Sequence, residues 1–124
     1  MRQKLTLRKR LESFRFALRG ISTILRTQPN AWIHAAATLI VAALGLALNL
    51  EVGQWCWLAL AVIAVWSAEA FNTALELLCD VASPAFHPLI EKAKDVSAGA
   101  VLIAAIGAAL IGGLIFVPRL LELF

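Results

Sequence analysis

Three long apolar segments decide what this chain can fold into. They cover residues 31–50, 54–80 and 96–117 of a chain of 124 residues, and each reaches the roughly 20 residues that an α-helix needs to cross a hydrocarbon core of about 30 Å. The sequence is 61% hydrophobic and 15% charged, which is more apolar surface than a soluble domain of this length can bury. We therefore expect an all-α integral membrane protein with three transmembrane helices, forming a single domain over residues 1–124.

Positive charge is concentrated before the first apolar segment. Most of the 11 lysines and arginines lie there, namely Arg2, Lys4, Arg8, Lys9, Arg10, Arg15, Arg19 and Arg26, whereas the stretch "NLEVGQ" between the first two segments has none. Because cytoplasmic loops of membrane proteins carry an excess of Lys and Arg, we expect a cytoplasmic N-terminus and a C-terminal tail on the outer side. The polar stretch that precedes the first segment is too long for a cleaved signal peptide, so this segment is expected to be a retained anchor.

Residues 1–28 have the pattern of an amphipathic helix lying on the membrane surface. One stripe of that helix carries the apolar side chains Leu7, Leu11, Phe14, Leu18, Ile21 and Leu25, with arginines at its flanks. Such a helix buries its apolar face at the interface and directs its arginines to lipid phosphates. The arginines either fix the topology only or also gather an anionic substrate such as a nucleotide. Anionic lipid explains them better than nucleic acid does. Pro29 disfavours helical geometry at Gln28, where the surface helix is expected to end.

The second apolar segment carries a polar face. At 100° per residue, Glu69, Asn72, Glu76 and Asp80 fall within about 80° of one another on a helix. The face should be deep in the membrane at Glu69 and approach the headgroups at Asp80. Ionisable residues in membrane helices normally face a bundle interior or a cavity and mark a functional site. The alternative, that they only hold helices together by hydrogen bonds, explains clustered like charges poorly.

Few cations are available to compensate these carboxylates. Lys94, with Asp95 beside it, stands at the start of the third apolar segment, and Pro88 suits the first position of a helix there. The hairpin should place Lys94 and Asp95 at the level of Glu76 and Asp80. One lysine leaves the site short of positive charge, so we expect a divalent cation, Mg²⁺, accompanied by phosphates. The third segment is rich in Gly and Ala, which permits close helix packing, and three helices enclose a polar cleft poorly. We therefore expect a homo-oligomer with sites between subunits.

Other polar or reactive residues are expected to be structural. Cys56 and Cys79 lie too far apart on one helix for a disulfide and are interpreted as apolar filler. Asn30 and His34, one turn apart, are expected to be satisfied by hydrogen bonds across the bundle rather than to act in catalysis.

Two stretches of this sequence match a known pattern. The stretch "EAFNTALELLCD" resembles the E-x-x-N-x-x-x-E-x-x-x-D segment of the diacylglycerol kinase and undecaprenol kinase family of small prokaryotic membrane lipid kinases. The stretch "AKDVSAGAVLI" is similar to the second signature of that family. The resemblance covers nearly the whole chain, and the pair of motifs at this separation is specific.

The resemblance implies an activity and a site. The activity is ATP- and Mg²⁺-dependent phosphorylation of a lipid hydroxyl in the bacterial cytoplasmic (inner) membrane, by a homotrimer whose active sites are shared between subunits. It implies Glu69 as general base and Glu76 as a metal ligand. It places the remaining residues around the nucleotide: Asn72, His87, Lys94 and Asp95. The chain has no G-x-x-x-x-G-K-[ST] loop, so side chains and metal must hold the phosphates.

Three questions remain open from sequence. The family often has a glutamate as second metal ligand where this chain has Gln28, and a glutamine carbonyl coordinates Mg²⁺ without adding charge, so metal affinity should fall. The lipid is either diacylglycerol or undecaprenol. Two other functions compete with the kinase: a small ion or proton pathway along the polar face, and a catalytically silent homologue.

Overall fold

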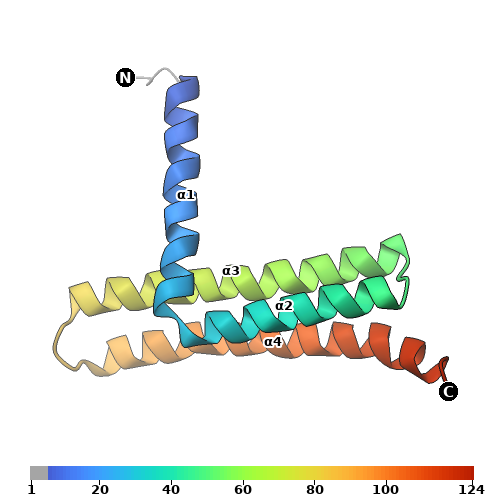
Figure 1. Ribbon diagram of the computed structural model, residues 1–124. Helices are drawn as coiled ribbons and strands as arrows, with labels where there is room; N and C mark the ends of the chain where they lie inside the picture. The colour runs from blue at the N-terminus through green and yellow to red at the C-terminus, as the bar shows by residue number, and fades with distance from the viewer. Residues whose placement is uncertain (1–5) are drawn as a thin grey trace.

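Four helices make up the part of the chain that the computed structural model describes, residues 6–124. They are α1 (Leu7–Thr27), α2 (Pro29–Ala47), α3 (Val52–Ala82) and α4 (Pro88–Leu121). Figure 1 shows α2, α3 and α4 side by side, with α1 projecting crosswise from the side of this bundle. The expectation of an all-helical fold is confirmed for the described residues. The part of the predicted surface helix before residue 6 lies outside them.

Three of the helices are long and apolar enough to cross a membrane, as predicted. α2 has 19 residues, which at about 1.5 Å per residue matches the hydrocarbon thickness of a bilayer. α3 and α4 have 31 and 34 residues and are longer than a hydrocarbon core requires. α4 begins at Pro88, before the apolar segment that starts at residue 96, because His87 accepts a hydrogen bond from the Leu89 amide and caps the helix.

The break between α1 and α2 is a single residue. Gln28 has φ −108° and ψ 111° and serves as the last cap of α1 and the first cap of α2. Pro29 follows at the first position of α2, where its missing N–H is not needed and its ring excludes helical geometry at the preceding residue. The predicted end of the first helix at Gln28 is confirmed.

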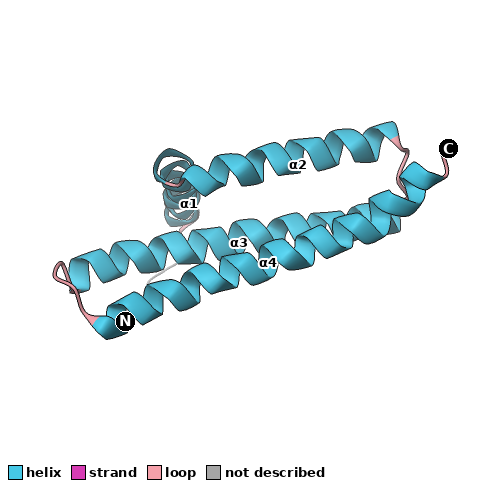
Figure 2. Ribbon diagram, turned by 90° about the horizontal axis from the view of Figure 1, so that it is seen from below, coloured by secondary structure: helices cyan, strands magenta, loops and turns pink. Residues whose placement is uncertain are grey.

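The α3 and α4 helices pack closely, while α2 stands farther from them over much of its length (Figure 2). The three helices come together at the end where α2 connects to α3, hereafter the α2–α3 end. An apolar core there contains Leu50, Leu58, Ile115 and Phe116. Gly45 is part of this contact, because a Cβ atom on it would lie 2.5 Å from the Trp55 ring. The absence of a side chain therefore lets α2 approach Trp55 of α3.

Polar groups at the α2–α3 end are paired. Arg119 near the end of α4 donates a hydrogen bond of 3.3 Å to Oε1 of Gln54, which also accepts one from the Glu51 amide. The Arg119 guanidinium lies 4.0 Å from the Glu51 carboxylate and 3.9 Å from that of Glu122. These contacts tie the end of α4 to the start of α3.

Candidate active site

The polar face of α3 is buried at one end and open at the other. Glu69 is 1% exposed and Asn72 is 7% exposed, Glu76 is half-buried, and Asp80 is exposed. The polar face is therefore graded in its burial within the protein, while its predicted gradient of depth in the membrane stays a prediction. The hydroxyl of Thr73, also buried, donates to the backbone carbonyl of Glu69 at 2.8 Å, so it satisfies the helix backbone and not the carboxylate.

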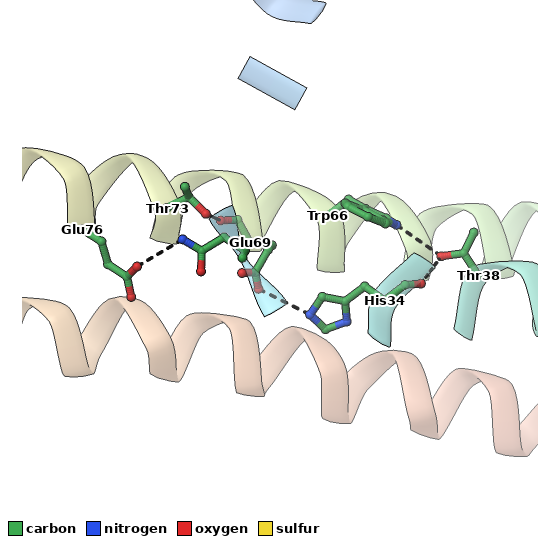
Figure 3. Close-up of polar contacts among 7 residues, drawn as sticks. His34, Thr38, Trp66, Glu69, Thr73 and Glu76 are labelled. Carbon is green, nitrogen blue, oxygen red and sulfur yellow. Dashed lines mark hydrogen bonds and ion pairs between the residues drawn. The ribbon is translucent and has the colours of Figure 1, made fainter. Parts of the chain in front are cut away.

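His34 of α2 lies opposite the Glu69 carboxylate. Its Nε2 is 3.4 Å from Oε2 of Glu69, as Figure 3 shows. Neither Oε1 nor Oε2 of Glu69 has a hydrogen-bond partner among residues 6–124, nor has Nε2 of His34 or Oδ1 of Asn72. A buried polar group without a partner costs free energy. Four such atoms in one place indicate a site that completes its hydrogen bonds with a bound molecule.

Trp66 and Thr38 hold the imidazole of His34 from the other side. The His34 and Trp66 rings meet edge to face, with centroids 6.2 Å apart. The Trp66 indole N–H donates to the Thr38 hydroxyl at 3.2 Å, and that hydroxyl donates to the His34 carbonyl at 2.7 Å (Figure 3). These contacts fix the ring beside Glu69.

Gln28 and Glu76 meet where α1 turns into α2. The Gln28 amide donates a hydrogen bond of 3.4 Å to Oε2 of Glu76. Rotating the Gln28 amide by a half-turn would place its carbonyl oxygen there instead, which gives two oxygen donors of the kind that Mg²⁺ prefers. Within residues 6–124 no group of three or more His, Cys, Asp and Glu residues is suited to a metal. Two oxygens are only part of a magnesium coordination shell, so an ion held by this pair would take its remaining ligands from phosphates and water.

Lys94 pairs with Asp80 across the α3–α4 hairpin. Its ammonium donates to Oδ1 of Asp80 at 2.5 Å, which confirms that the hairpin brings Lys94 to the level of Asp80. A cavity of about 550 Å³ beside this pair is also lined by His87, Glu91 and Asp95. Its mixture of one ammonium, several carboxylates and an imidazole suits a polyphosphate with an associated cation.

Similarity to known proteins decides the family. The model of the prokaryotic diacylglycerol kinase family matches residues 15–116. A relative named undecaprenol kinase, from Bacillus subtilis (strain 168), is 39% identical over 109 residues, which cover 88% of this chain and 89% of that protein. A relative named diacylglycerol kinase, from Synechocystis sp. (strain ATCC 27184 / PCC 6803 / Kazusa), is 41% identical over 114 residues, which cover 91% of this chain and 65% of that protein.

The chain belongs to the prokaryotic diacylglycerol kinase family. The sequence-based prediction of a membrane lipid kinase is confirmed at that level. In this family member the predicted site residues form three groups along α3. Glu69 and Asn72 line one cavity with His34. Gln28 contacts Glu76. The third group lines the cavity at the α3–α4 connection: His87, Lys94 and Asp95.

One expectation about α2 is wrong. Asn30 is exposed and its side chain makes no hydrogen bond within the described part of the chain, and Nε2 of His34 also lacks one. The physical reason is that His34 faces the buried carboxylate of Glu69 at 3.4 Å, whereas Asn30, one turn earlier, lines the same cavity with its side chain exposed. Sequence reasoning thus missed His34 as a neighbour of Glu69. Its place among apolar residues on α2 was the available signal, but helix periodicity does not reveal which residue of a neighbouring helix it meets.

Proposed function

We propose that this kinase catalyses ATP- and Mg²⁺-dependent phosphorylation of a membrane lipid hydroxyl at the cytoplasmic face of the membrane. The observation that carries the proposal is the Glu69 carboxylate on the apolar helix α3: it is 1% exposed, it lies 3.4 Å from His34, and neither of its oxygens accepts a hydrogen bond from any of residues 6–124. A carboxylate held in this way accepts a proton from an alcohol, and its position requires that alcohol to belong to a lipid.

Glu69 acts as the general base. It accepts the proton of the lipid hydroxyl as the lipid oxygen forms a bond to the γ-phosphorus of ATP and the bond to the β–γ bridging oxygen breaks, which releases ADP. Phosphoryl transfer of this kind depends on positioning and charge neutralisation and needs no covalent intermediate. The absence of competing hydrogen bonds to Glu69 leaves its oxygens available to the substrate.

The residues beyond Glu69 bind the nucleotide. Asn72 lies about one turn from the base on α3, and we assign its side chain to the phosphates. Lys94 supplies positive charge to them, which requires that it exchange its contact with Asp80 for a phosphate oxygen. Asp95 and His87 line the same cavity as Lys94, and His87 is held in place by its cap on α4.

Glu76 and Gln28 are the proposed ligands of Mg²⁺. When bound, the ion would neutralise phosphate charge and orient the triphosphate. Glu76 contributes a carboxylate, and Gln28 contributes a carbonyl oxygen after its amide rotates. Because Gln28 adds no charge, binding depends more on the triphosphate than it would with two carboxylates.

The proposal extends to the placement of the protein in the membrane and to its assembly. We place the protein in the bacterial cytoplasmic (inner) membrane with a cytoplasmic N-terminus, and α1 on the cytoplasmic surface as an amphipathic helix. The crosswise direction of α1 (Figure 1) and the exposure of Leu7, Leu11, Phe14 and Leu18 support this placement.

We also propose a homotrimer with shared sites, supported by the large area of apolar side chains that one copy leaves exposed on α2 and α4. Crosslinking in mild detergent that gave only monomers would contradict the trimer.

Both lipid classes named for the relatives fit a hydroxyl at this depth. Undecaprenol presents a terminal alcohol and diacylglycerol presents the free alcohol of glycerol, and either reaches Glu69 from within the bilayer. The proposed acceptor is therefore diacylglycerol or undecaprenol.

One assay tests the activity. Purified protein in lipid–detergent micelles is mixed with labelled ATP, Mg²⁺ and either diacylglycerol or undecaprenol. We expect a labelled lipid phosphate from at least one lipid, and its loss without Mg²⁺ and in Glu69→Gln. No product from either lipid would show a catalytically silent homologue, and proton conduction in liposomes without ATP would show an ion pathway instead. Full turnover by Glu69→Gln would refute the role of Glu69 alone.

A further inference from the structure

Two cavities meet at His34. An apolar cavity of about 270 Å³ lies between α2, α3 and α4, and a second cavity of about 240 Å³ contains Glu69 and Asn72. Both are lined by His34 of α2 and Ala105 of α4. The polar site and the apolar space therefore lie next to each other at His34, and the apolar space extends from there toward the α2–α3 end.

The junction contains the unpaired polar atoms. Glu69 and Asn72 are 1% and 7% exposed, and both carboxylate oxygens of Glu69, Oδ1 of Asn72 and Nε2 of His34 lack hydrogen-bond partners among residues 6–124. An alcohol hydroxyl donates one hydrogen bond and accepts others. Placed to one side of the contact between Glu69 and His34, whose nearest atoms are 3.4 Å apart, it would donate to the carboxylate and accept from Nε2–H.

The apolar cavity has no spare hydrogen-bonding group of its own. Apart from His34, its polar side chains within the described chain are Thr38 and Trp66, and these are satisfied: the indole N–H donates to the Thr38 hydroxyl, which donates to a backbone carbonyl. The cavity exists because α4 presents only small side chains to it, namely Ala105, Ala108, Ala109 and Gly112.

We propose that this cavity binds the hydrocarbon tail of the lipid alcohol, with the hydroxyl at the His34–Glu69 junction and the first carbons beyond it against Ala105 and Ala108. The inference rests on the proposed function for the identity of the substrate. It adds a rule for substrate selection: the part of the lipid that directly follows the hydroxyl must carry no hydrogen-bonding group. A diacylglycerol places ester carbonyls a few bonds from its hydroxyl, where Thr38 and Trp66 have no free donor for them. A single-chain isoprenoid alcohol has no such groups and is the preferred class.

The first experiment fills the cavity. Ala108→Leu adds bulk inside it, whereas the control Ala100→Leu adds the same bulk on an exposed position of the same helix that does not line it. With geranylgeraniol as acceptor, we expect Ala108→Leu to raise the KM for the alcohol by about tenfold or more, a change of ~1.4 kcal/mol, without changing the KM for ATP. Equal KM values for the alcohol in Ala108→Leu, Ala100→Leu and the unsubstituted protein would overturn the tail site.

The second experiment needs no variant and no turnover. A long-chain alcohol carrying a diazirine in its chain is photolysed with the unsubstituted protein, and labelled residues are mapped by mass spectrometry. Labels on the cavity residues Val41, Leu58 and Ala108 are expected, and competition by geranylgeraniol should remove them. Labels confined to outward-facing residues, as would result if a second copy of the chain filled the cavity, would overturn the proposal. Labelling does not require phosphorylation. A protein without kinase activity could therefore still be labelled in the cavity, and an active kinase could lack labels there, so the two proposals fail separately.

The third experiment tests the selection rule. Thr38→Val removes the acceptor of the Trp66 N–H and so frees a donor in the cavity. The ratio of turnover on dioleoylglycerol to turnover on geranylgeraniol should rise by about tenfold, because an ester carbonyl then gains a hydrogen bond that it otherwise lacks. An unchanged or lower ratio would refute the rule.

Discussion

The α2–α3 end and the buried region around His34 and Glu69 treat polar groups in opposite ways. At the α2–α3 end, Arg119, Gln54 and Glu51 contact one another above an apolar core. Farther along α3, Glu69 is more deeply buried than any of them, and among residues 6–124 its carboxylate has no hydrogen bond, only the 3.4 Å contact with His34. The first arrangement stabilises the fold, and the second holds unpaired groups ready for a substrate at a cost in stability. Variants in the first region should therefore lower the free energy of unfolding, and variants in the second should lower turnover.

The largest expected effect is on activity alone. Glu69→Gln should lower turnover by about 10²–10⁴-fold, the range of a general base, while the free energy of unfolding stays the same or rises, since a neutral amide is cheaper to bury than an unpaired carboxylate. Phosphate transfer from labelled ATP and denaturation in detergent followed by circular dichroism measure the two properties. A large loss of stability would mean that Glu69 is needed for packing, and the proposed contrast between the Glu69 region and the α2–α3 end would be wrong.

The opposite result is expected at the α2–α3 end. Phe116→Ala should lower the free energy of unfolding by about 3 kcal/mol, because the Phe116 side chain is 8% exposed within the apolar core. Turnover per folded molecule should remain within about twofold, since Phe116 lines none of the cavities described above. The same two measurements apply. A tenfold loss of turnover in the folded fraction would show that packing at the α2–α3 end affects catalysis at Glu69.

A smaller effect is expected at the proposed metal ligands. Gln28→Glu would place a second carboxylate beside Glu76, where the Gln28 amide now donates a hydrogen bond. The Mg²⁺ concentration that gives half-maximal activity should fall by about fivefold, or ~1 kcal/mol. Titration of activity with Mg²⁺ at fixed ATP measures it, with Asn49→Asp as a control that adds a carboxylate at an exposed position of the α2–α3 end. No change in Gln28→Glu would place Gln28 away from the metal.

The smallest effect is expected from the paired charges at the α2–α3 end. Arg119→Gln keeps a hydrogen-bond donor but removes the charge, and its ion pairs of 3.9 and 4.0 Å are long. The free energy of unfolding should fall by less than about 1 kcal/mol, and less still at high salt. Denaturation at two salt concentrations checks this, and a loss of 2 kcal/mol or more would show that Arg119 has a larger structural role.

Much of the fold was predictable because it depends on local rules. Apolar length predicted the three spanning helices, Pro29 predicted the break at Gln28, and the helical period predicted that Glu69 and Asn72 share a buried face. The contact of His34 with Glu69 was not predictable in this way, because it depends on how α2 is aligned along α3. The same holds for the contact of Arg119 with Gln54, between residues far apart in sequence.

The position of Gln28 couples the orientation of α1 to the geometry of the site. One extended residue connects α1 to α2, and the side chain of that same residue contacts Glu76. A connection of one residue is too short for α1 to tilt without moving Gln28. With α1 on the bilayer surface as proposed, a change in bilayer thickness or curvature that tilts α1 would therefore move the Gln28 side chain relative to Glu76. Lipid composition would then affect the geometry of this site as well as supply its substrate.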